Sequence, residues 1–166
     1  MTQRISSWTV TFAFVLFSSA FMADAAIPDP SDAPSCTIEK YGAARLSGEF
    51  TRRTAPETTS GGVRLYGRIE ITEHTREIKA TKGAAIGLAH LFRNIPLSEE
   101  LDLVVTHPPM RRSDGTMSTG FTTKWSPDHE FTIYGLDHDY EIVKGEWRFQ
   151  YRFRGVVLCA QEFRTY

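Results

Sequence analysis

Residues 146–153 read Glu-Trp-Arg-Phe-Gln-Tyr-Arg-Phe, an unbroken alternation of aromatic and polar side chains. Because successive side chains of a β-strand point to opposite faces of a sheet, the aromatic rings fall on one face and the arginines on the other. Arg154-Gly155 follows, and residues 156–166 return with further apolar side chains. The pattern predicts a β-hairpin at the C-terminus with one buried face.

Shorter apolar stretches separated by turn-forming residues precede this hairpin. Residues 63–72 alternate and predict a half-buried strand, whereas residues 84–92 are apolar on both faces and predict a strand buried on both sides. Proline lacks a backbone N–H, so His107-Pro108-Pro109 should end the strand that starts at Leu101. Further strands are predicted at 36–46, 101–106 and 130–134.

No segment shows sustained helical periodicity, so the fold class is all-β. About seven or eight short strands within residues 36–166 predict a single immunoglobulin-like antiparallel β-sandwich. A small barrel is the alternative.

The N-terminus predicts export. Arg4 precedes an apolar stretch from Trp8 to Met22, and Ala23-Asp24-Ala25 has the small-x-small pattern of a signal-peptidase site. An uncleaved membrane anchor is the alternative, but the stretch is shorter than the roughly twenty residues of a spanning helix. We expect residues 1–25 to be a signal peptide and residues 26–35 a flexible proline-rich leader. The mature protein is then periplasmic or secreted, without stable membrane insertion.

Both cysteines of the chain, Cys36 and Cys159, lie in the exported part. Disulfides persist outside the cytoplasm, so we predict a bridge that joins the two ends of the domain. Two separate buried thiols are the alternative.

Charge excludes one class of partner. Removing residues 1–25 takes away one base, Arg4, and one acid, Asp24, so the net charge stays at −1. Nucleic acid is bound mainly through phosphate neutralisation, and we therefore expect no nucleic-acid partner.

Several motifs resemble a bacterial domain-of-unknown-function family, number 3859. They cover nearly all of the mature chain and lie at residues 135–149, 154–155, 158–163, 55–61, 106–109 and 114–115. The chain departs from the family at Tyr140, where a tryptophan is expected, and at His90, where an aromatic residue is expected. The resemblance implies a small β-sandwich of exported or envelope proteins with no assigned activity, and it supplies no catalytic residues.

Catalytic and metal-binding motifs are weak. No Ser or Cys stands at a spacing typical of a nucleophile with its base, and no cofactor motif is present. Asp128-His129-Glu130 and Asp137-His138-Asp139 contain metal-ligating side chains, but on a strand Asp137 and Asp139 would face away from His138. We interpret them as polar turn residues and predict no metal. Alternation places His90 on a buried face, which favours its neutral form.

A binding surface is predicted on the C-terminal hairpin. Arg148, Arg152 and Arg154, with Arg164, form a basic ladder that could meet an anionic partner, although such a ladder is also typical of a solvated face. Trp125 lies beside Ser126-Pro127, where it is either exposed for sugar or protein contact or a partly buried loop anchor.

Two functions remain open from the sequence. The first is an exported, non-enzymatic β-sandwich that binds an envelope protein or an anionic glycan through an edge strand or the arginine-bearing hairpin. The second is a small His/Asp-dependent hydrolase, with or without a metal ion, or a ligand-binding protein around residues 128–139. We favour the first, because no paired catalytic groups stand at a diagnostic spacing.

Overall fold

The structure is a computed structural model that describes residues 30–112 and 114–166, so the predicted signal peptide lies outside the described residues. Nine strands follow one another in the described chain, with two short 3-10 turns. The strands are β1 (Ser35–Thr54), β2 (Gly62–Glu73), β3 (Glu77–Ile78), β4 (Ala85–Arg93), β5 (Leu101–Arg111), β6 (Met117–Trp125), β7 (Phe131–Gly135), β8 (Gly145–Phe153) and β9 (Val156–Thr165), and the turns are η1 (Pro30–Asp32) and η2 (Asp139–Glu141).

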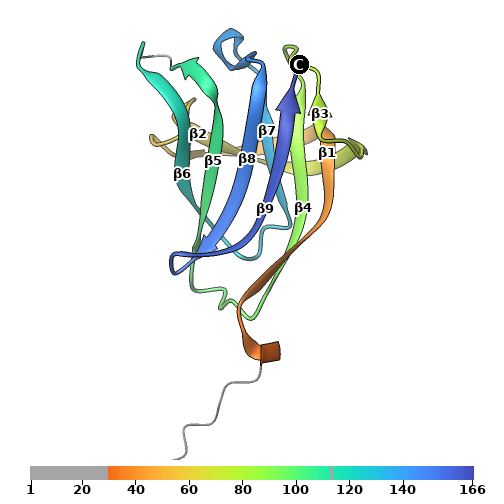
Figure 1. Cartoon of the computed structure of the whole chain (residues 1–166), viewed down its shortest axis with the longest axis vertical. Coiled ribbons are helices and arrows are strands. Elements are labelled where there is room, and N and C mark those ends of the chain that lie inside the picture. The colour runs from red at the N-terminus through yellow and green to blue at the C-terminus, as the bar shows by residue number, and fades with distance from the viewer. Residues whose placement is uncertain (1–29, 113) are drawn as a thin grey trace, which may run out of the picture.

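The strands form two sheets that pack face to face (Figure 1). One sheet has the order β2-β1-β4-β7 and the other β3-β9-β8-β5-β6. The core lies between them and contains apolar residues from both, which is the construction of a β-sandwich. The predicted sandwich is therefore confirmed, and the barrel alternative is wrong because the strands divide into two separate sheets. No helix in the described part of the chain is long and apolar enough to cross a membrane.

The C-terminal hairpin has the predicted form. β8 pairs antiparallel with β9 from Gly145↔Thr165 to Phe153↔Val156, and every aromatic side chain of β8 is buried. Arg154 (φ 50°) and Gly155 (φ 82°) both have positive φ, as a two-residue type I′ hairpin turn requires. β8 is nevertheless an interior strand, because β5 pairs with its other edge.

The prediction that His107-Pro108-Pro109 ends a strand is wrong. β5 continues to Arg111, and a register shift between Thr106 and Met110 lets the chain pass the two prolines without ladder bonds there. Its partner on this side is β6, a strand that the sequence did not predict.

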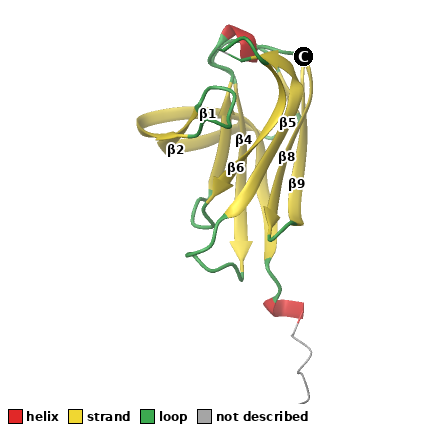
Figure 2. Ribbon diagram, turned by 90° about the vertical axis from the view of Figure 1, so that its left-hand side faces the viewer, coloured by secondary structure: helices red, strands yellow, loops and turns green. Residues whose placement is uncertain are grey.

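The first strand is longer than predicted and carries an arm. β1 pairs with β4 over Ser35–Ala43 and with β2 from there to Thr54. We call residues 46–70 the arm. It runs across the upright strands in Figure 1 and leaves the sandwich sideways in Figure 2.

The tip of the arm returns to the other sheet. Arg53 Nη2 donates to the carbonyl of Lys124 on β6 at 2.8 Å, and Arg112 Nη2 donates to the carbonyl of Glu57 at 3.1 Å. The arm therefore bridges the two sheets.

Gly87 permits the base of the arm to pack against β4. A Cβ at this position would lie 2.6 Å from both Ala44 Cβ and Ile71 Cδ1, a distance that side chains do not tolerate. Close approach of β1 and β2 to β4 therefore requires a glycine here.

One side of the sandwich is closed covalently. The predicted disulfide between Cys36 on β1 and Cys159 on β9 is present, with the two Cα atoms 5.6 Å apart. Further along the same two strands, Tyr41 of β1 contacts Phe163 of β9 edge-on, with ring centroids 6.1 Å apart. We call this the closed side.

On the opposite side, which we call the open side, the sheets end at the edge strands β6 and β7. No ladder joins these two strands, so the space between the sheets is accessible there except where the arm covers it.

Candidate functional site

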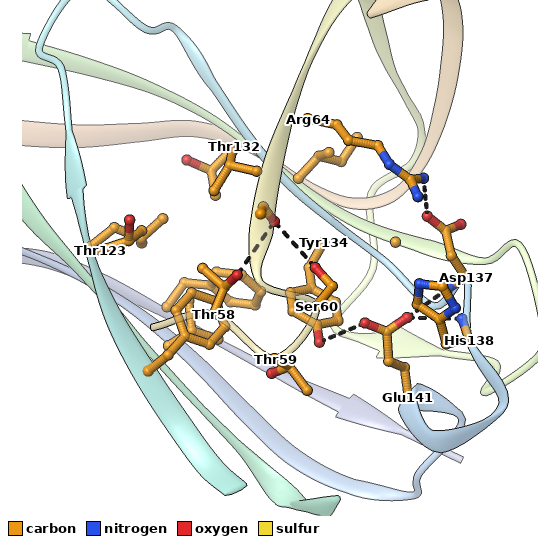
Figure 3. A pocket seen from close by; sticks show the side chains of 18 of the residues that line it. Thr58, Thr59, Ser60, Arg64, Thr123, Thr132, Tyr134, Asp137, His138 and Glu141 are labelled. Carbon is orange, nitrogen blue, oxygen red and sulfur yellow. Dashed lines mark hydrogen bonds and ion pairs between the residues drawn. The ribbon is translucent and has the colours of Figure 1, made fainter. Parts of the chain in front are cut away.

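A pocket of about 340 Å³ lies on the open side, between the two sheets and under the arm. Its volume falls within the roughly 300–1,000 Å³ range of small-molecule sites. It is lined by apolar side chains, by polar groups of the arm and by the segment after β7 (Figure 3).

The apolar wall comes mainly from the sheet with the order β3-β9-β8-β5-β6, which we call the β8 sheet. Leu103 and Val105 of β5, Phe121 and Trp125 of β6, and Phe149 of β8 all line the pocket. Their side chains face the space between the sheets because alternate residues of each strand point inward. This wall would contact the apolar part of a ligand.

The polar wall is organised by Glu141. Its Oε2 accepts from the backbone N–H groups of Asp137 (3.0 Å) and His138 (2.9 Å), and its Oε1 accepts from the hydroxyl of Tyr134 (3.1 Å). Burial raises the pKa of the Glu141 carboxyl, while these hydrogen bonds act in the opposite direction. Glu141 thus shapes the turn after β7 and orients Tyr134 in the pocket wall.

A pair of arginines lies on the arm. Arg52 of β1 and Arg64 of β2 are directly opposite each other in the antiparallel ladder, and both line the pocket. Arg64 Nη1 is 2.7 Å from Asp137 Oδ2, and its guanidinium lies 5.5 Å from the Phe50 ring centroid. Arg52 packs over Gly62 and has no hydrogen bond or ion pair with another described residue.

Hydroxyl groups hold the tip of the arm over the pocket. Thr58 and Ser60 donate to the carbonyl of Gly62, at 3.3 and 3.1 Å (Figure 3), and Thr58 also lies 2.7 Å from the carbonyl oxygen of Ala55. Ala55, Thr58 and Thr59 are buried although they belong to a connection between strands. The tip is therefore a packed cover over the pocket.

His90 lies behind the pocket and is buried, as predicted. Its Nε2 is 3.0 Å from Thr132 Oγ1, which also accepts from the Tyr151 hydroxyl, and its ring contacts Phe92 and Tyr151. Burial lowers the pKa of His90 to about 4, with a smaller contribution from His129. The imidazole is neutral near pH 7, and Thr132 links this network to the pocket.

The arginines predicted as a binding surface do not line this pocket. Arg148 pairs with Glu162 (3.4 Å), Arg152 donates to Gln150 Oε1, and Arg154 makes a bidentate contact with Glu99. Arg148 and Arg152 lie on the outer face of an interior strand, while Arg154 is in the β8–β9 turn. Their role in binding stays a prediction.

Trp125 does not have the exposed position that one of its two sequence interpretations required. It ends β6 and is only 4% exposed, with its ring edge-on to His129 at a centroid distance of 5.0 Å. It therefore matches the buried-anchor alternative and lines the pocket from within.

The two Asp/His triplets lie at opposite ends of β7, so they do not converge. Asp137 pairs with Arg64, Asp139 pairs with Lys82 at 3.0 Å, and His138 stacks on Tyr140 at 5.1 Å. Within residues 30–112 and 114–166, no group of three or more His, Cys, Asp or Glu side chains is placed to hold a metal ion.

One serine contacts a histidine. Ser118 Oγ lies 3.4 Å from His107 Nε2, and His107 Nδ1 is 2.8 Å from the carbonyl oxygen of Pro108. Both side chains are buried and neither lines the pocket. The pair connects β5 to β6 and is not open to a substrate.

The comparisons with known proteins agree with this architecture. Two packed sheets, antiparallel except for the short parallel pairing of β3 with β9, define an immunoglobulin-like β-sandwich. The chain is similar in fold to an immunoglobulin-like protein from Pseudomonas aeruginosa solved by crystallography. That similarity has a TM-score of 0.52 and 22% sequence identity, and it covers 74% of this chain and 96% of the other. A family model described as Domain of unknown function (DUF3859) matches residues 37–165. The chain belongs to this family. No curated protein matches it.

Sequence reasoning reached only part of the pocket. The ligand-binding alternative placed a site around residues 128–139, and Thr132, Tyr134, Asp137 and His138 from that range line the pocket. Arg52 and Arg64 become neighbours only through the register of the arm, which lies beyond the predicted end of the first strand. Glu141 falls within one of the motifs that resemble the family, and that motif was the available signal for the polar wall. Thr123 of β6 also lines the pocket, and it was missed because β6 was not predicted.

Proposed function

We propose that this protein is an exported, non-enzymatic binding module whose ligand site is the pocket on the open side. The observation that carries the proposal is a cavity of about 340 Å³ between the sheets, with an apolar wall and converging polar groups. Sites for small ligands are commonly concave and mostly apolar, with a few placed polar groups.

Export is supported by the N-terminal pattern and by the disulfide. The bond between Cys36 and Cys159 joins segments 123 residues apart, and such bonds persist mainly outside the cytoplasm. The periplasm or the cell exterior is therefore the proposed location.

A binding role is favoured over catalysis by the chemistry of the pocket. Its buried carboxylate, Glu141, is engaged by two backbone N–H groups and a phenol, and Asp137 is engaged by Arg64. General acid–base catalysis needs a group within reach of a substrate proton, whereas these carboxylates already serve local structure.

The pocket is also a stronger candidate than the arginine-bearing hairpin. Arg148, Arg152 and Arg154 each have a partner within the chain; the first two lie on an outer sheet face and Arg154 lies in the turn that follows. A partner at that face would have to replace interactions that already exist.

Filling the pocket tests the proposal. Thr123 is buried and lines it, so Thr123→Phe places a ring in the space that a ligand would occupy. Thr122→Phe is the matched control, because Thr122 is exposed on the opposite face of β6. The probe is N-phenyl-1-naphthylamine, a neutral fluorophore whose emission rises in apolar surroundings.

We expect saturable binding of one probe molecule to the purified protein and to the Thr122→Phe variant. Thr123→Phe should weaken binding by about tenfold or more, since a blocked apolar contact of this size exceeds roughly 1.4 kcal/mol. Equal binding by both variants would show that the probe binds elsewhere and would overturn the proposal.

A further inference from the structure

We infer that the pocket binds a small amphipathic carboxylic acid, with its carboxylate on Arg52 and its apolar part against the β8 sheet. The inference rests on the proposed function, because it assigns the ligand class of the same pocket. Two arginines of the arm, Arg52 and Arg64, line this pocket.

The two arginines form an unfavourable cross-strand pair. Arg52 and Arg64 are cross-strand neighbours at one register position of the arm. Like charges directly opposite each other on adjacent strands destabilise a sheet. An unfavourable arrangement that lines a cavity points to a ligand rather than to stability.

Three charged side chains that line the pocket have partners within the chain. Asp137 is ion-paired with Arg64 at 2.7 Å, and Glu141 is held by the N–H groups of Asp137 and His138 and by the Tyr134 hydroxyl. Arg52 is the lining charge that has no counter-charge among the described residues. One unmatched guanidinium fits one anionic group, and its planar fork matches a carboxylate.

The rest of the ligand faces the wall beyond the arm. The wall beyond the arm is mainly apolar: Leu103, Val105, Phe121 and Phe149 have no polar side-chain atom, and only Thr123 and Trp125 of β6 add a hydroxyl and an indole N–H. A hydrophilic anion would leave this wall unused, whereas an aliphatic or aromatic acid would bury apolar surface against it. Charge and shape together therefore select an amphipathic monoanion.

The experiment is competition against bound N-phenyl-1-naphthylamine by octanoate and by 1-octanol, which share an eight-carbon chain and differ in charge. It is run on the full-length protein and on two variants. Arg52→Gln removes the unmatched charge, and Arg45→Gln is the control because Arg45 is exposed on β1 and does not line the pocket.

We expect octanoate to compete about tenfold more strongly than 1-octanol, since hydrogen bonds to a charged group contribute more than neutral ones. The preference should disappear in Arg52→Gln, persist in Arg45→Gln and weaken with added salt.

Equal competition by the two compounds, or an octanoate preference that survives in Arg52→Gln, would overturn the assignment of the ligand class while the pocket remained a binding site. Absence of saturable probe binding would overturn the proposed function itself. The two failures are thus distinguishable.

Discussion

The closed and open sides of the sandwich use the same sheets for different purposes. On the closed side, β1 and β9 are joined by Cys36–Cys159, and Tyr41 packs against Phe163. On the open side, β6 and β7 leave a pocket that only the arm covers. The difference indicates that one side holds the sheets together so that the other can keep a cavity.

Removing the disulfide should produce the largest effect. We expect the Cys36→Ala/Cys159→Ala double variant to lose about 4 kcal/mol of unfolding free energy, because the bond closes a loop of more than one hundred residues in the unfolded chain. Denaturant unfolding measures the change, and wild-type protein under reducing conditions is the control. A loss below about 1 kcal/mol would contradict the role given to the closed side.

We expect acid to destabilise the protein because the buried His90 of β4 resists protonation. Its folded-state pKa, about 4, is below the ordinary value of 6.5, so the folded state binds fewer protons than the unfolded state in this range. The free energy of unfolding should therefore fall by about 3 kcal/mol as the pH decreases from 6.5 to 4.

The variant His90→Phe should remove most of that pH dependence, measured by unfolding at several pH values. His74→Gln should retain it, because His74 is exposed. An unchanged slope in His90→Phe would assign the acid sensitivity to other groups.

Two tryptophans allow the same substitution to be made in different surroundings. Trp147 Nε1 donates to Thr165 Oγ1 at 3.1 Å in the packed core, whereas Trp125 Nε1, beside the pocket, is buried without a hydrogen-bond partner. We expect Trp147→Phe to cost roughly 2 kcal/mol and Trp125→Phe under about 1 kcal/mol, since only the first breaks a hydrogen bond. Thermal unfolding of both variants checks the order, and a reversed order would contradict it.

The smallest effect is expected on the outer face. Arg148→Glu/Arg152→Glu should change the free energy of unfolding by no more than about 0.5 kcal/mol, because exposed ion pairs contribute little. Probe binding to the pocket should be unchanged in the fluorescence titration. Loss of probe binding would place the ligand site on the hairpin, as the sequence suggested.

Sequence reasoning captured the closed side better than the open side, for a physical reason. The alternation in residues 146–153 reports which side chains are buried, and Cys36 and Cys159 are the chain's only cysteines. The pocket depends on strand register and on the close approach of distant segments. Arg52 faces Arg64 only because of the ladder, and the base of the arm, at Ala44 and Ile71, packs on β4 only because Gly87 lacks a side chain. The alternation of side chains within a short segment does not report strand register or contacts between distant strands. It also gave a wrong strand end at Pro108 and Pro109, where a bulge lets β5 continue.

The most direct test of the comparison is backbone amide chemical-shift mapping of the labelled protein during titration with N-phenyl-1-naphthylamine. We expect saturable shifts confined to the open side, at residues such as Leu103, Phe121, Thr123 and Ile133, with the amides around Cys36 and Cys159 unmoved. Shifts centred on the outer face of β8 and β9, or no saturable shifts, would contradict the assignment of the open side as the binding site.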